Sequence, residues 1–188
     1  YEQKKNQWRA IEAVNGYSIR EIFVLDASTL LLGSEAGLLR YEEARDRISH
    51  VASDANTCGA QQALSNSIQA IKRDHNGQIW IGTPYGAVVF SDNNRCDWYQ
   101  QDFNQTGALS RSDILALFPD RDGVLWLGTF AGGVNKWNTR AGSWQHHLVA
   151  SDTQSSPVLS VLRDRQQTLW LGTSDKGLLR QRKGEMGV

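Results

Sequence analysis

DRDGVLWLGT, at residues 120–129, joins a tight turn to a short apolar strand. Asp120 at the first turn position can cap its own backbone, and Gly123 at the fourth tolerates a positive φ. The apolar part, called the cassette below, returns as LLGS at 31–34, WIGT at 80–83 and WLGT at 170–173. The glycines of the four cassettes lie 49, 46 and 44 residues apart. This period is close to that of propeller blades and longer than that of helical or leucine-rich repeats.

The residues around each cassette follow one order. An apolar alternation precedes the turn, as in Ile114, Ala116 and Phe118, and a strand that begins near a glycine follows the cassette. A fourth strand is marked by Ile48, Trp98 and Trp144. Four short antiparallel strands joined by hairpin turns form the blade of a β-propeller. The sequence therefore predicts an all-β fold, with about four blades in this chain.

Two details of the repeat carry further expectations. The turns at 26–29 and 164–167 lack the glycine, so we expect them to be strained or longer. Tryptophan and glycine of a cassette point to the same face of their strand, and glycine in a strand marks a close approach. We expect a tryptophan of the neighbouring blade to fill that space. The tryptophans recur at blade positions, apart from Trp137, and are interpreted as core rather than as a cofactor cage.

The two ends of the chain do not coincide with the ends of a repeat. Trp8 matches the fourth-strand position, so residues 1–16 are predicted to supply the outer strand of a split blade. Residues 17–53, 64–103 and 109–149 are predicted as blades, and residues 156–188 as the first three strands of the split blade. The chain starts at Tyr1 without an initiator methionine, so we expect it to be a piece of a longer protein. A closed small ring and a segment of a larger propeller are the two alternatives, and the second is favoured.

The charge balance limits the classes of partner. Lys and Arg number 20, and Asp and Glu also number 20, so the formal net charge is zero. A nucleic-acid partner would require a basic surplus on at least one face, so none is expected. No apolar stretch is long enough to cross a bilayer.

The pattern D-x-x-G-x-[LI]-W-[LI]-G-T, followed by G-G-[LV], resembles the two-component regulator propeller repeat. The fullest match is residues 120–129 with Gly132-Gly-Val134, and the second is residues 74–83 with Gly86. The resemblance implies an extracytoplasmic sensor region of a hybrid histidine kinase or diguanylate cyclase, periplasmic and anchored to the membrane. It also implies ligand binding without catalysis. A propeller lyase or glycosidase, and a purely structural protein-binding propeller, remain the alternatives.

The cassette-to-third-strand loops and the blade-to-blade loops share the face on which propellers usually bind ligands. On that face we expect Tyr85, Phe130, Arg111 and Asp113 to contact a small molecule such as a carbohydrate. The competing interpretation is that these are ordinary loop residues and a solvated ion pair. A partner protein, a second copy, or the remainder of a larger propeller are the other predicted partners. No catalytic residues, cofactor or metal site are predicted.

Two pairs of residues raise the questions of a disulfide and of a metal site. Cys58 and Cys96 are predicted on opposite faces, so they can pair only if the connection 51–65 folds over the blade. The alternative of two free thiols is favoured. His146 and His147 are adjacent in a predicted strand, so they point to opposite faces and are not expected to bind one metal ion.

Overall fold

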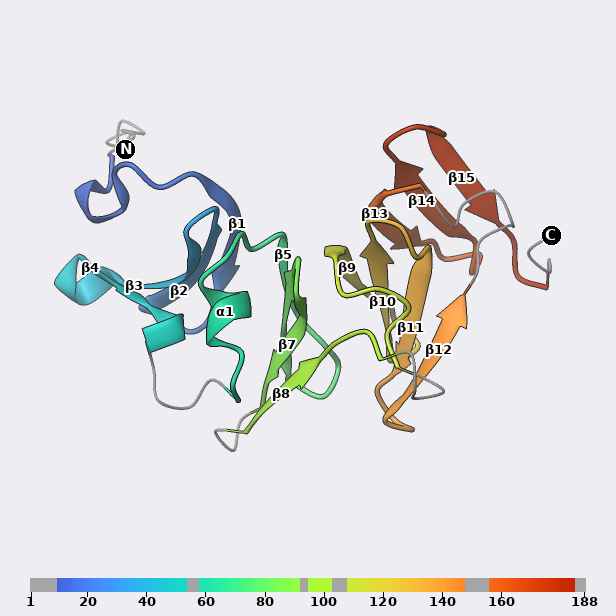
Figure 1. Cartoon of the computed structure of the whole chain (residues 1–188), viewed down its shortest axis with the longest axis horizontal. Helices are drawn as coiled ribbons and strands as arrows, with labels where there is room; N and C mark the ends of the chain where they lie inside the picture. The colour runs from blue at the N-terminus through green and yellow to red at the C-terminus, as the bar shows by residue number, and fades with distance from the viewer. Residues whose placement is uncertain (1–9, 54–57, 92–94, 103–107, 148–155, 185–188) are drawn as a thin grey trace, which may run out of the picture.

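The computed structural model describes residues 10–53, 58–91, 95–102, 108–147 and 156–184. Four antiparallel sheets stand side by side in chain order (Figure 1). Blade 1 contains β1 (Ile19–Val24), β2 (Thr29–Ser34), β3 (Gly37–Glu42) and β4 (Arg47–His50). Blade 2 contains β5 (Ala70–Arg73), β6 (Ile79–Thr83), β7 (Gly86–Phe90) and β8 (Cys96–Tyr99). The predicted all-β fold of four-stranded propeller blades is confirmed.

The second half of the chain repeats this arrangement. Blade 3 contains β9 (Ile114–Pro119), β10 (Val124–Thr129), β11 (Val134–Asn138) and β12 (Ser143–His147). Blade 4 contains β13 (Val158–Arg163), β14 (Leu169–Thr173) and β15 (Leu178–Gln181), so its sheet has three strands in the described part of the chain. The short helical elements are η1 (Glu12–Val14), η2 (Glu43–Arg45), η3 (Val51–Ser53) and α1 (Gln61–Leu64).

The four blades do not close into a ring. Blades 1 and 4 lie at opposite ends of the row (Figure 1), and the innermost strands β1, β5, β9 and β13 contact one another in that order. Of the two predicted arrangements, this one agrees with a segment of a larger propeller. Trp8 lies outside the described residues, so its place in the last blade stays a prediction. Ile11, Val14 and Tyr17 pack against blade 1.

The cassette glycines of blades 1, 2 and 3 mark the points where the next blade comes closest. A Cβ on Gly33 would lie 2.9 Å from Ile68 Cγ2, and one on Gly82 would lie 2.9 Å from Ile114 Cγ2. The expectation of a neighbouring tryptophan was therefore wrong, because the partner is an isoleucine of the next blade, Ile114 at the start of β9 and Ile68 just before the start of β5. Since these innermost strands lie in contact and the isoleucine fills the space between them, no room is left for a side chain at the glycine position. Trp80 packs against the next blade beside the glycine, with Leu117 and Leu125.

Replacing Gly128 with alanine should lower the free energy of unfolding by about 1–3 kcal/mol, the usual cost of overpacking. The new Cβ would lie 2.7 Å from the carbonyl oxygen of Val158, a backbone atom that cannot move aside alone. Gly172→Ala is the matched control, because its Cβ would meet the hydroxyl of Ser160, which can rotate away. Urea denaturation of the two variants would measure the difference. Equal destabilisation would show that the close approach of blades 3 and 4 does not limit the size of this residue.

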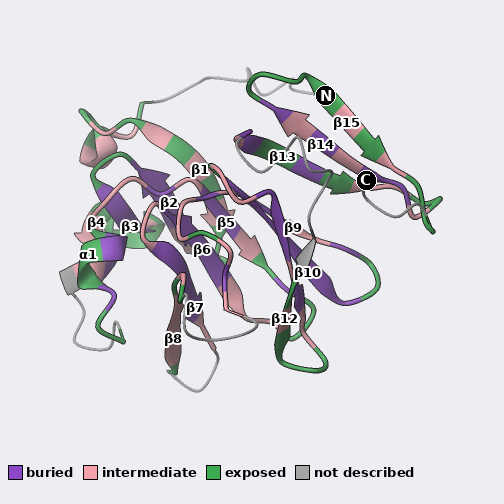
Figure 2. Cartoon of the chain, turned by 45° about the vertical axis from the view of Figure 1, so that its right-hand side comes forward, coloured by how far each residue is buried: buried purple, intermediate pink, exposed green. Residues whose placement is uncertain are grey.

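The two end blades each leave one apolar face uncovered. Leu162 and Leu178 of blade 4 are 52% and 67% exposed, and Ile22 and Val24 of blade 1 are each 64% exposed. Ile71, which occupies the position of Ile22 in blade 2, is buried against blade 1. Figure 2 shows the same contrast between the interior blades and blade 4. The uncovered faces are those that a further blade would cover.

The turns that lack glycine differ from each other. Gln167 has a φ of +67°, whereas Gly77 and Gly123 at the same turn position have φ of +82° and +81°. The predicted strain is therefore present in blade 4. In blade 1 the turn is neither longer nor left-handed. Leu25, rather than Asp26, takes the first position and donates its N–H to Thr29 O, and no residue of this turn has a positive φ.

Gln167→Gly should raise the free energy of unfolding by about 1 kcal/mol, because glycine adopts a positive φ without the Cβ clash. Gln166→Gly is the control, since Gln166 does not have a positive φ and gains only unfolded-state entropy from the change. Thermal unfolding of both variants would test this. A destabilised Gln167→Gly variant would contradict it.

Candidate functional site

Three of the four predicted ligand-binding residues come together at one end of blade 3. Phe130 donates its backbone N–H to the carbonyl oxygen of Asp113 at 3.0 Å. Arg111 lies against the loop that contains Gly132, where a Cβ would lie 2.6 Å from Arg111 Cγ. Phe130 is exposed, as the binding hypothesis requires. Ligand binding by these residues stays a prediction.

Tyr85 lies apart from those three. It follows β6 in blade 2 and packs, half-buried, against the apolar cluster between blades 1 and 2. Its carbonyl oxygen accepts a hydrogen bond from Trp98 Nε1 at 3.0 Å, so the loop is held to β8. None of the four predicted residues lines the polar pocket between blades 3 and 4, the hollows beside it or the aromatic groove described below.

The turn aspartates do more than cap their own backbone. Asp74, Asp120 and Asp164 each accept a hydrogen bond from the indole Nε1 six residues later, at 2.9, 2.8 and 2.8 Å. The other carboxylate oxygen of Asp120 accepts the N–H groups of Asp122 and Val124. Each turn is therefore locked to its own cassette tryptophan. A six-residue spacing from Asp to Trp in three copies was the sequence signal for this pair.

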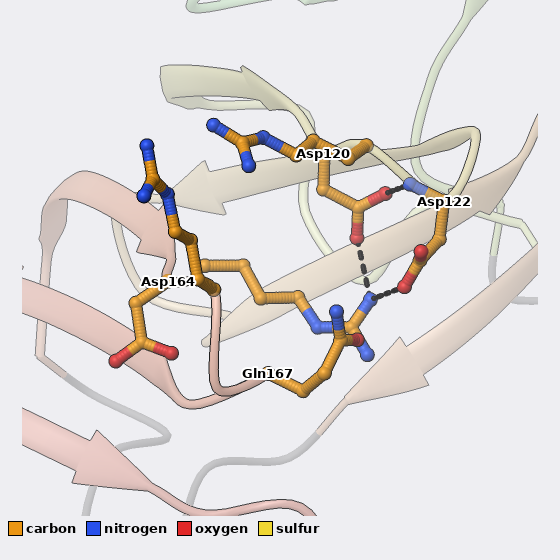
Figure 3. A pocket seen from close by; sticks show the side chains of 7 residues that line it. Asp120, Asp122, Asp164 and Gln167 are labelled. Carbon is orange, nitrogen blue, oxygen red and sulfur yellow. Dashed lines mark hydrogen bonds and ion pairs between the residues drawn. The ribbon is translucent and has the colours of Figure 1, made fainter.

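A polar pocket lies between the turns of blades 3 and 4, and Figure 3 shows its lining. Arg163, at the end of β13, reaches across to blade 3 and contacts Asp120 Oδ2 at 2.7 Å and Asp122 Oδ2 at 2.9 Å. The pocket has a volume of about 300 Å³. Its lining residues are Asp120, Arg121, Asp122, Arg163, Asp164, Arg165 and Gln167. This pocket lies on the face of the Asp turns, opposite to the predicted ligand face.

The two turn carboxylates of this pocket are held in the charged form. Burial alone would raise the pKa of Asp120, but hydrogen bonds from Trp126, Arg163 and two backbone N–H groups bring it below the ordinary value. The hydrogen bond from Trp170 is the main cause that lowers the pKa of Asp164. Both carboxylates are therefore ionised, and groups of the protein itself bind them.

A second hollow of about 200 Å³ continues from the first, because Arg163 and Gln167 line both. The remaining residues that line it are Trp126, Lys136, Gln145, Leu169, Gln181, Arg182, Lys183 and Gly184. Lys136 Nζ lies 5.8 Å from the centre of the Trp126 ring, and Arg163 Cζ lies 5.9 Å from it. The indole is thus flanked by two cations, an arrangement that stabilises both.

An aromatic groove of about 580 Å³ lies between blades 2 and 3. Tyr99, Trp137 and Trp144 line it, with ring centroids 4.7–5.4 Å apart. Trp137 is 8% exposed, so it belongs to the core like the repeated tryptophans. Its Nε1 has no hydrogen-bond acceptor among the described residues. The rings pack on one another, so the groove forms the edge of the inter-blade core.

Cys58 and Cys96 form a disulfide with Cα atoms 5.2 Å apart. The preference for two free thiols was wrong, because the connection 51–65 does fold over. Its helix α1 buries Ala63 and Leu64 between blades 1 and 2, which brings Cys58 to the start of β8.

His146 and His147 pair with Asn135 and Val134 across β11 and β12, at adjacent strand positions. In the part of the chain that the structure describes, no three metal-ligating side chains gather at one point. None of its helices has the length and apolar character needed to cross a membrane.

The fold and its repeats define the chain as a segment of a β-propeller. The model of the two component regulator propeller family matches residues 63–85, 108–131 and 153–175, which include three of the four cassettes or their turns. The chain therefore contains three two component regulator propeller repeats. A comparison with curated proteins gives no match.

Several solved structures share the fold. The extracellular domain of the putative hybrid two component system BT4673 from B. thetaiotaomicron is 18% identical, with a TM-score of 0.68 over 88% of this chain and 21% of that one. The corresponding domain of BT3049 from the same organism is 20% identical, with a TM-score of 0.62 over 86% and 20%. PorZ of Porphyromonas gingivalis, a surface component of the type-IX secretion system, is 16% identical, with a TM-score of 0.61 over 87% and 26%. This chain thus spans about a fifth to a quarter of each of these proteins.

Proposed function

We propose that this chain is part of the extracytoplasmic sensor region of a bacterial signal-transduction receptor, and that it binds a ligand without catalysing a reaction. The three two component regulator propeller repeats are the observation that carries the proposal. The similar domains of BT4673 and BT3049, described as extracellular parts of hybrid two component systems, support it. The output partner is a histidine kinase or a diguanylate cyclase, beyond a membrane anchor.

The disulfide gives independent physical support for this location. Cys58 and Cys96 are the two cysteines of the chain, and they are joined. Disulfides persist in the periplasm and outside the cell, whereas the cytosol keeps thiols reduced. A periplasmic or surface location therefore suits the covalent structure.

The ligand is proposed to be a small molecule, with carbohydrates as the first class to test at Phe130, Arg111 and Asp113. Tyr85 serves as the comparison, since it lies apart from these three. A thermal-shift screen against sugars and amino acids should give a stabilising hit that Arg111→Ala or Asp113→Ala abolishes and Tyr85→Ala does not. Hydrolysis or elimination of a polysaccharide that is lost in Arg111→Ala would instead establish the propeller lyase or glycosidase.

A structural role at the cell surface is the second candidate, and the shared fold with PorZ favours it. Cell fractionation of the full-length gene product, with alkylation of free thiols in intact cells, separates the candidates. A receptor should fractionate with the inner membrane, have Cys58 and Cys96 protected from alkylation, and change its kinase or cyclase output with the ligand. Alkylated cysteines, or a full-length product without an output domain, would contradict the receptor proposal.

A further inference from the structure

We propose that the seam between blades 3 and 4, on the face of the Asp turns, is a binding groove for an acidic saccharide chain. Its carboxylate or sulfate groups would bind between Arg121 and Arg165. This groove lies on the face opposite the predicted ligand residues. Binding there does not depend on the signalling role, so the two proposals can fail separately.

The seam between blades 2 and 3 is closed by contacts between its own polar groups, and it serves as the comparison for the seam between blades 3 and 4. His75, at the second position of the blade 2 turn, contacts the carbonyl oxygen of Asp120 with its Nε2. Asn76 Nδ2 donates to Thr139 O at 3.1 Å. The blade 2 turn therefore folds across onto blade 3 and uses its own polar groups to do so.

The same turn position behaves differently at the next seam. Arg121 replaces His75 there, and Arg165 occupies this position in blade 4. Both side chains line the pocket of Figure 3, both residues are exposed, and neither guanidinium has a carboxylate partner among the described residues. Two successive turns thus present an arginine to one hollow.

None of the three aspartates of the pocket forms an ion pair with Arg121 or Arg165 among the described residues. Asp120 holds Trp126 and Arg163, and Asp164 holds Trp170 and the N–H of Thr168. Asp122 contacts Arg163, which is thereby neutralised at the base of the pocket. Arg121 and Arg165 remain to bind an anion. A guanidinium can bind a carboxylate or sulfate through two parallel hydrogen bonds.

The second hollow extends the groove with the same sign of charge. It contains Lys136 and Lys183, and no aspartate or glutamate is among its described lining residues. In a chain with zero net charge, this concentration of cations along one seam favours a ligand with several negative groups.

The uncharged lining favours a saccharide over a nucleic acid. Gln145, Gln167 and Gln181 line the groove, and amide side chains hydrogen-bond sugar hydroxyls. Single-stranded nucleic acid would need exposed aromatic faces on which its bases stack. The one indole here, Trp126, is 4% exposed and flanked by Lys136 and Arg163.

The test compares Arg121→Ala/Arg165→Ala with the control Arg45→Ala/Arg47→Ala. The control removes the same charge from exposed residues of blade 1. Binding of polygalacturonate, dextran sulfate, neutral dextran and single-stranded DNA would be measured by calorimetry at low and physiological salt. The first polymer carries carboxylates and the second carries sulfates, so the two arms identify the anionic group.

Wild-type protein should bind at least one of the two acidic polymers and not neutral dextran. Arg121→Ala/Arg165→Ala should weaken this binding about tenfold or more, given the strength of charge-assisted hydrogen bonds, while the control stays within about twofold. Loss of binding in both variants, or in neither, would overturn the site. Failure of wild type to bind either acidic polymer would overturn the ligand class, as would tighter binding of DNA. Unfolding curves of the two variants should coincide with that of wild type, so that a loss of binding reports on contact.

Discussion

Replacing Cys58 and Cys96 with serine should lower the free energy of unfolding by about 4 kcal/mol. The bond joins residues 38 positions apart, and closing a loop of that length restricts the unfolded chain by roughly this amount in the loop-entropy model. It also holds the connection in which Leu64 packs at the close approach to Gly37, where a Cβ would lie 2.5 Å from Leu64 O. Urea denaturation of the oxidised protein and of the double variant would measure the loss.

The cysteine content supplies the control for this experiment. The chain has no other cysteine, so a reducing agent should destabilise wild type to the level of the double variant and leave the variant itself unchanged. A double variant as stable as the oxidised protein would show that the packing of α1 alone fixes the connection. The pairing of blades 1 and 2 would then not depend on the covalent bond.

Asp120→Ala should cost about 3–5 kcal/mol, because it leaves Arg163 without its buried partner and Trp126 without its acceptor. Asp120 is 3% exposed, and its two oxygens accept hydrogen bonds from four groups. Asp74→Ala is the matched control. Asp74 is equally enclosed and holds Trp80, but no arginine contacts it in the described structure. We therefore expect Asp74→Ala to cost about 1–3 kcal/mol.

A double-mutant cycle with Arg163→Ala would isolate the ion pair. If Asp120→Ala and Asp74→Ala cost the same, the contact from blade 4 contributes nothing to stability.

The stabilisation that Asp120 provides depends on pH, and the direction of this dependence follows from its lowered pKa. Since the pKa of Asp120 is below its ordinary value, its stabilising effect is present above a pH of about 4 and is lost as the pH falls through the folded-state pKa. The difference between wild type and Asp120→Ala should therefore shrink in acid.

The repeat itself could be read from the sequence because its signals are local. A two-residue alternation, an Asp-x-x-Gly turn and the cassette recur at nearly constant spacing, and each strand depends on its own residues. The partner of Gly82 could not be read in this way. Which side chain meets that glycine depends on how closely successive innermost strands approach, and this is a property of the assembled stack.

The disulfide and the seam pocket were missed for a related reason. The connection 51–65 belongs to no repeat, so no periodic pattern indicates the path that brings Cys58 to Cys96. The pocket is formed by the ends of two blades, so no single repeat contains the residues that line it. Arginine at the second position of two successive turns, Arg121 and Arg165, was the available signal. Phe130, Arg111 and Asp113 lie close together because one blade carries all three, whereas Tyr85 belongs to another blade, and ligand binding by the four residues stays a prediction.

The uncovered faces of blades 1 and 4 have a consequence for how the chain opens. In a linear stack, each blade gains stability from its own sheet and from the neighbours that it touches, so a terminal blade gains from one side only. Blade 4, with three described strands and with Leu162 and Leu178 open to solvent, has the least of both contributions. The backbone amides of β13–β15 should therefore exchange with solvent before those of blades 2 and 3. The ion pair between Arg163 and Asp120 then links blade 4, which opens most readily, to blade 3, which is better protected.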